Sequence, residues 1–108
     1  MSSAADFKEV ERLWREYCAI PFPEGLAGQE VSGVEVAMVD TVASGCIDTF
    51  IARQGSLDTW RTAILGLCYR NLGVATVGLQ GEARAYVARL EILARLVLES
   101  VRDGAKPA

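Results

Sequence analysis

Apolar residues recur every three or four positions along four long segments of the chain, the spacing that gathers them on one face of an α-helix. The clearest helix is predicted for residues 82–102, whose apolar stripe is Tyr86, Leu90, Leu93, Val97 and Val101. A second is predicted for residues 4–19, with the stripe Phe7, Val10, Leu13, Trp14, Tyr17 and Cys18. It ends before Pro21, because the residue preceding a proline avoids the helical conformation.

The two middle segments are less regular. The run GVEVAMV, residues 33–39, alternates as a β-strand does, but a single short strand without a partner is not stable. Apolar residues also recur every fourth position from Val34 to Phe50, so a helix over residues 34–53 is predicted. A further helix over residues 57–75 would be capped by Ser56, with Asp58 in its first turn and an apolar face that includes Trp60, Leu67 and Leu72.

Four helices joined by turns predict an all-α fold, an up-and-down antiparallel four-helix bundle. Residues 21–33 contain two prolines and three glycines and are predicted to form a loop between the first two helices. A chain of 108 residues is long enough for one domain with a buried core, and a single helical domain over residues 1–108 is expected.

Charge and composition indicate which partners and which cellular location the chain is suited to. Eleven basic residues are interleaved with fourteen acidic ones, for a net charge of −3. They form no basic stripe of the kind that binds nucleic acid, so nucleic acid is not expected as a partner. The N-terminal segment lacks the apolar run of a secretory signal, and no apolar stretch is long enough to span a membrane. Three widely spaced cysteines favour a reducing, cytoplasmic location, where each is expected to pack as a small buried apolar residue.

The chain contains no histidine, which excludes Ser-His-Asp and Cys-His catalysis and every histidine-ligated metal within it. Its cysteines form no Cys-x-x-Cys pair, and its glycines match no phosphate-binding loop. No catalytic residue, metal or cofactor is therefore predicted, and the chain is not expected to be an enzyme.

A polar strip interrupts the apolar run VDTVASGCIDTF. Helical spacing places Asp40, Ser44 and Asp48 along one edge of the 34–53 helix, beside Gly45. This strip is either a solvated edge or a contact surface for a neighbouring chain or cation. Arg89 lies within the apolar arc of the 82–102 helix, so its guanidinium either reaches the solvent at the rim or pairs with Asp40 or Asp48.

The apolar arcs of the two helices at 34–53 and 82–102 exceed half of their circumference, which is more than a small monomer readily buries. The sequence therefore predicts a non-enzymatic helical interaction protein, a homodimer or an adaptor, regulator or inhibitor of another protein. The alternative is a small-molecule-binding bundle. The residues predicted to line its pocket are Trp14, Met38, Phe50, Trp60, Asn71 and Tyr86. Asn71, predicted on an apolar face, would either specify the packing register or line that pocket.

Overall fold

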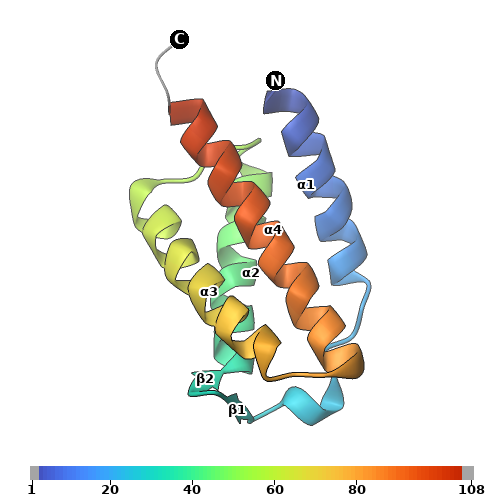
Figure 1. Cartoon of the computed structure of the whole chain (residues 1–108). Helices are drawn as coiled ribbons and strands as arrows, with labels where there is room; N and C mark the ends of the chain where they lie inside the picture. Colours follow the sequence, from blue (N-terminus) through green and yellow to red (C-terminus); the bar gives the residue numbers. More distant parts are fainter. Residues whose placement is uncertain (1–2, 106–108) are drawn as a thin grey trace.

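The computed structural model describes the backbone of residues 3–105 and the side chains of residues 7–104. Figure 1 shows four helices above a small β-hairpin. The elements in chain order are α1 (Ser3–Cys18), a short 3-10 turn (Glu24–Leu26), β1 (Glu30–Val31), β2 (Val34–Glu35), α2 (Val36–Ala52), α3 (Thr59–Val77) and α4 (Gly81–Ala105). Each helix end lies within three residues of its predicted position.

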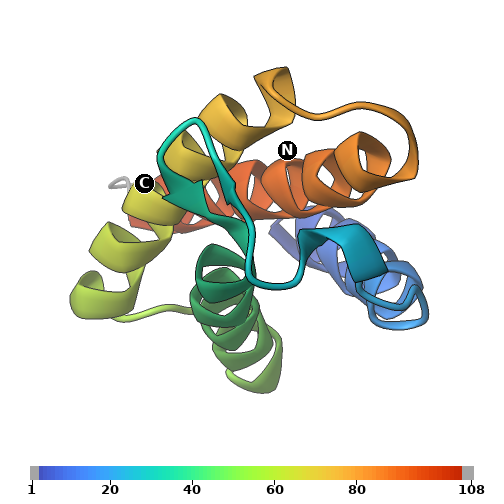
Figure 2. The ribbon, with the colours of Figure 1, turned by 90° about the horizontal axis from the view of Figure 1, so that it is seen from below.

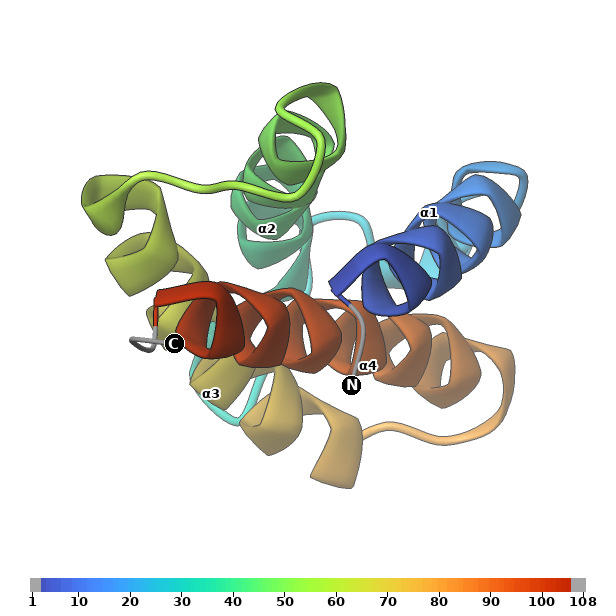
Figure 3. The same ribbon diagram turned by 90° about the horizontal axis from the view of Figure 1, so that it is seen from above.

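Helix α4 is the element on which the other three helices pack. It contacts α1, α2 and α3, whereas α1 and α2 touch each other little (Figure 3). The prediction of a mainly helical fold whose four helices pack against one another is confirmed. The core that results contains large side chains withdrawn completely from water, each stabilising the fold by about 1.5–3 kcal/mol relative to exposure. The largest of them are Phe50, Ile47, Leu65, Leu72, Leu90 and Leu93. Within the described residues, no helix is long and apolar enough to cross a bilayer.

The structure corrects the prediction that residues 34 and 35 begin a helix. Val31 pairs with Val34, and Glu30 with Glu35, in an antiparallel hairpin. The turn residues Ser32 and Gly33 both have positive φ, as a type I′ turn requires. The partner of this strand lies three residues upstream, inside the predicted loop, so the strand is not unpaired.

The hairpin rests against the end of α3, as Figure 2 shows. A Cβ atom added to Gly78 would lie 2.8 Å from Cγ1 of Val31 and 3.2 Å from Oγ of Ser32. Glycine at this position therefore lets the hairpin approach the helix end closely, which connects the start of α2 with the end of α3.

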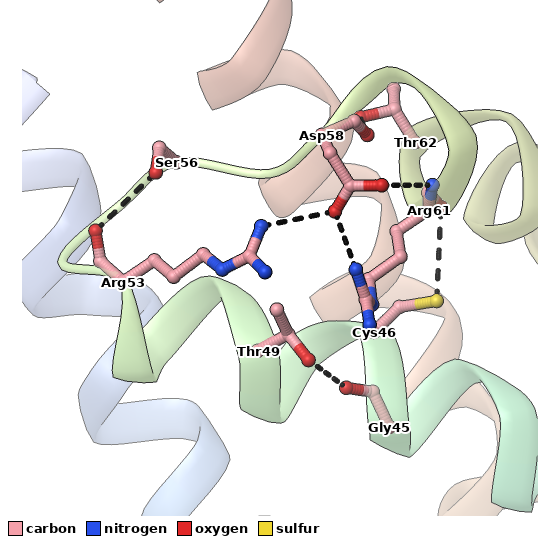
Figure 4. A network of polar contacts seen from close by, with 8 residues as sticks. All are labelled: Gly45, Cys46, Thr49, Arg53, Ser56, Asp58, Arg61 and Thr62. Carbon is pink, nitrogen blue, oxygen red and sulfur yellow. Dashed lines mark hydrogen bonds and ion pairs between the residues drawn. The ribbon is translucent and has the colours of Figure 1, made fainter.

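The structure also corrects the N-cap of α3. Asp58, rather than Ser56, is the capping residue, and its Oδ2 accepts a hydrogen bond of 3.1 Å from the backbone N–H of Arg61. Its Oδ1 pairs with the guanidinium groups of Arg53 at 3.1 Å and Arg61 at 2.8 Å (Figure 4). Ser56 instead donates to the backbone carbonyl of Arg53 at 3.5 Å. One carboxylate thus links the end of α2 to the start of α3.

We expect Asp58→Ala to lower the Tm by a few degrees, because α3 loses its cap and both ion pairs. Asp58→Asn should have a smaller effect, because an asparagine side chain also caps a helix but carries no charge. Thermal unfolding followed by circular dichroism measures both. Asp48→Ala, at an exposed aspartate of α2, is the control and should leave the Tm unchanged.

The contribution of Asp58 should also depend on pH. Hydrogen bonds from Arg61 lower the pKa of Asp58 from 3.8 to about 2. Since the folded-state pKa lies below the unfolded one, the stabilisation is complete above about pH 4 and declines as the pH falls toward 2. The Tm difference between wild type and Asp58→Ala should shrink over that range. A difference that stays constant would show that the charge of Asp58 does not contribute.

Candidate functional site

The predicted apolar face of α3 is correct in part, since Leu72 is buried as expected. Trp60 and Leu67, predicted to face the core, are 72% and 54% exposed. The side chains that α3 buries are Leu65, Cys68, Leu72 and Ala75. Apolar residues lie around most of this helix, so its periodicity does not select one face. Packing against α2 and α4 determines which of them are buried.

Asn71 is exposed, which contradicts the prediction that its amide lies in an apolar core face. Asn71 is exposed together with Trp60 and Leu67, because the three share one side of α3. Its amide groups therefore have access to water and require no partner within the fold.

Helix α2 adds two exposed apolar side chains, Met38 and Val42, on the side next to α3. The thiol of Cys46 lies 3.7 Å from the carbonyl oxygen of Arg61, which fixes how the two helices are aligned. Helix α3 runs back alongside α2 and packs against it (Figure 1). We name these exposed apolar side chains the α2–α3 face: Met38, Val42, Trp60, Leu67 and Val74.

The α2–α3 face is comparable in area with the largest apolar patch of a typical monomeric protein, which is often functional. Its members expose between 38% (Val42) and 72% (Trp60) of their surface. For side chains of ~150–250 Å², this amounts to on the order of 500 Å² of apolar surface. Contiguous apolar patches of several hundred Å² mark interaction sites on soluble proteins. The arrangement is therefore suited to docking another surface.

The residues of the polar strip, Asp40, Ser44 and Asp48, differ in their surroundings. Asp40 accepts hydrogen bonds at Oδ1 from the hydroxyl of Tyr17, which is buried on α1, and from Oγ of Ser44 at 3.2 Å. Asp48 is exposed on the next turn. The partner of Asp40 is thus a tyrosine rather than Arg89, and the sequence offered no signal for a contact between residues 23 positions apart. Burial, followed by the bond to Asp40, raises the pKa of Tyr17 well above its usual value, so its hydroxyl remains a donor.

Tyr17 is also the centre of an aromatic cluster that joins α1 to α4. Its ring centroid lies 4.8 Å from that of Tyr86 and 5.8 Å from that of Trp14. Phe22, in the loop after α1, meets Tyr86 edge-on at 5.5 Å. Aromatic pairs at these separations add stability beyond the area they bury.

Arg89 is exposed, and no ion pair joins it to another residue in the described part of the chain. It lies at the side of an open hollow of about 630 Å³, bounded by the loop after α1 and the first turns of α4. The hollow is also lined by Phe22, Tyr86, Glu24 and Glu82.

The residues predicted to line one pocket are distributed over three places. Trp14 and Tyr86 belong to the aromatic cluster around Tyr17. Phe50 is completely buried in the core, where its ring lies 5.9 Å from that of Phe7. Met38, Trp60 and Asn71 are on the outer surface of α2 and α3. The structure does not bring the six together.

The three cysteines differ in exposure. Cys46 and Cys68 are buried as predicted, whereas Cys18 is exposed at the end of α1. Burial raises the pKa of all three thiols, so none is an activated thiolate. Within residues 7–104, no group of three or more cysteine or carboxylate side chains is placed to hold a metal ion.

Comparison with known proteins adds no relative. No protein-family model matches the chain, and searches of curated proteins and of solved structures find no significant match.

We expect Tyr17→Phe to lower the free energy of unfolding by about 1 kcal/mol, because Asp40 loses a hydrogen-bond donor while remaining partly buried. Urea denaturation measures the change. The matched control is Tyr69→Phe, which removes the hydroxyl of a partly buried tyrosine on α3. Equal stability losses in the two variants would show that the bond between Tyr17 and Asp40 has no specific role.

Proposed function

We propose that this chain is a non-enzymatic interaction protein, an up-and-down antiparallel helical bundle that forms a homodimer through its α2–α3 face. The observation that carries the proposal is Trp60, a large aromatic side chain in the first turn of α3 that is 72% exposed. Tryptophan is the residue most enriched among those that dominate binding energy at protein interfaces. In its cytoplasmic setting the dimer would act as an adaptor, regulator or inhibitor of another protein.

The size of the face supports a dimer. A standard interface takes ~800 Å² from each partner, of which a little over half is apolar. The apolar area of the α2–α3 face, on the order of 500 Å², fills that share. Polar residues at its edge, such as Thr41 and Arg70, would supply the rim.

The chemistry of the side chains supports a non-enzymatic role. The sequence has no histidine to act as a general base near neutral pH. Every cysteine has a raised pKa, and Tyr17 and Tyr86 are held in their neutral form in the same way. The chain thus has no histidine base, and its thiols and these two tyrosines are held in their neutral, less nucleophilic forms.

We expect the wild-type chain to be a dimer at tens of micromolar, as measured by size-exclusion chromatography with light scattering. Trp60→Glu and Leu67→Glu should each weaken the dimer at least ~10-fold, because each places a charge in the centre of the apolar contact. Both variants should keep the helical circular dichroism spectrum, since neither side chain is in the core.

The matched control is Ile92→Glu. Ile92 is 43% exposed on α4, outside the α2–α3 face, so this variant carries the same charge and should remain dimeric. A wild-type chain that stays monomeric at tens of micromolar would contradict the proposal, as would an equal effect of all three substitutions.

A second candidate, a small-molecule-binding bundle, is favoured by the hollow beside Arg89. Its volume of about 630 Å³ is that of an ordinary ligand pocket. The ring of Phe22 offers an apolar wall, and the guanidinium of Arg89 can pair with a carboxylate. Because Glu24 and Glu82 also line the hollow, the ligand class that fits is a small zwitterion with an apolar body, whose carboxylate pairs with Arg89 and whose ammonium group pairs with a glutamate.

Fluorescence of Trp14 tests this second candidate. Trp60→Phe leaves Trp14 as the only tryptophan, and Trp14 is joined to the hollow through Tyr17 and Tyr86. The zwitterions phenylalanine and 6-aminohexanoate should change its emission, and Arg89→Gln should weaken the response at least ~10-fold. A response that is absent at millimolar concentrations, or unaffected by Arg89→Gln, would contradict ligand binding at this hollow.

A further inference from the structure

We infer that the two copies meet through α3 itself, antiparallel, with the two-fold axis passing beside Leu67. This inference rests on the proposed homodimer and adds the arrangement of its interface. It follows from the spacing of the exposed residues, from their sizes and from the position of one charge.

The spacing on α3 is that of a helix-pairing seam. Trp60, Leu67 and Val74 recur every seventh residue, so they form a nearly straight line along the exposed side of the helix. The line is ~21 Å long, at 1.5 Å per residue. A second helix lying along it would contact all three side chains.

The sizes of these side chains favour an antiparallel pair. The line runs from a large tryptophan through a leucine to a smaller valine. A parallel pair would place Trp60 against Trp60 of the second copy at one end and Val74 against Val74 at the other. The tryptophan end would then be overpacked, and the valine end would contain a gap. An antiparallel pair centred on Leu67 places each Trp60 against Val74 of the second copy and keeps the helix separation even.

Arg70 favours the same arrangement. It is exposed on α3 beside the line of apolar residues. A parallel pair would bring the two Arg70 side chains together, which is unfavourable for like charges. About an axis at Leu67, Arg70 instead lies opposite Ile64 of the second copy, and Asn71 lies opposite the small Ala63. The dipoles of two antiparallel helices also attract each other.

Helix α2 completes the contact. Met38 and Val42 of α2 are exposed on the α2–α3 face, so they would border the contact between the two α3 helices. A methionine side chain is flexible and adapts its shape to an aromatic ring. The axis then produces two identical contacts of this kind, as an isologous dimer requires.

Cysteine cross-linking tests the arrangement. The exposed Cys18 is first changed to serine, and Leu67→Cys is introduced into that chain. Under mild oxidation Leu67→Cys should form a disulfide-linked dimer at least ~10-fold faster than Trp60→Cys or Val74→Cys alone, because only a residue at the axis meets its own copy. A mixture of Trp60→Cys and Val74→Cys chains should cross-link to each other. Ile92→Cys, on α4, is the control and should remain uncross-linked.

The outcomes separate this inference from the homodimer itself. Rapid linkage at Leu67 together with the mixed linkage supports the antiparallel arrangement. Rapid linkage of Trp60→Cys and Val74→Cys each to its own copy overturns it in favour of a parallel pair. A chain that is dimeric by light scattering but linked at none of these positions also overturns it, while the homodimer stands. A monomeric chain refutes the proposed function first.

Discussion

The packing of three helices on α4 is the constraint on which the rest of the structure depends. Tyr86, Leu90, Leu93 and Val97 are buried along one helix that contacts α1, α2 and α3. Each of those helices buries the side that faces α4 and its neighbours. Among the residues that the structure describes, no other element packs over the outer sides of α2 and α3. Five of the apolar side chains exposed there form the α2–α3 face.

Polar contacts determine how the surrounding helices are placed. Asp58 joins the end of α2 to the start of α3, and Asp40 joins α2 to Tyr17 of α1. The second contact matters because α1 and α2 otherwise touch little. Both aspartates are thus engaged within the fold. The exposed groups that remain for recognition are the apolar α2–α3 face and the hollow beside Arg89.

Periodicity was sufficient to locate all four helices, because strongly apolar stripes and the proline and glycine breaks agree with one another. It placed Leu72 correctly but could not separate the exposed Trp60 and Leu67 of α3 from the buried Leu65, because all three are apolar. The hairpin escaped prediction because each strand has only two residues and the partner of Val34 lies within a glycine-rich segment. The bond between Tyr17 and Asp40 depends on tertiary packing, so no local pattern in the sequence indicates it.

The separation between core and exposed face bears directly on function. The α2–α3 face shares no large side chain with the buried core, so polar residues at its five positions would leave the packing on α4 intact. In a monomer, a tryptophan and a leucine at such positions confer no stability and promote non-specific association. Their placement at heptad spacing along one helix is useful when a second helix covers them. The same five side chains that the fold does not need are therefore those that association would bury.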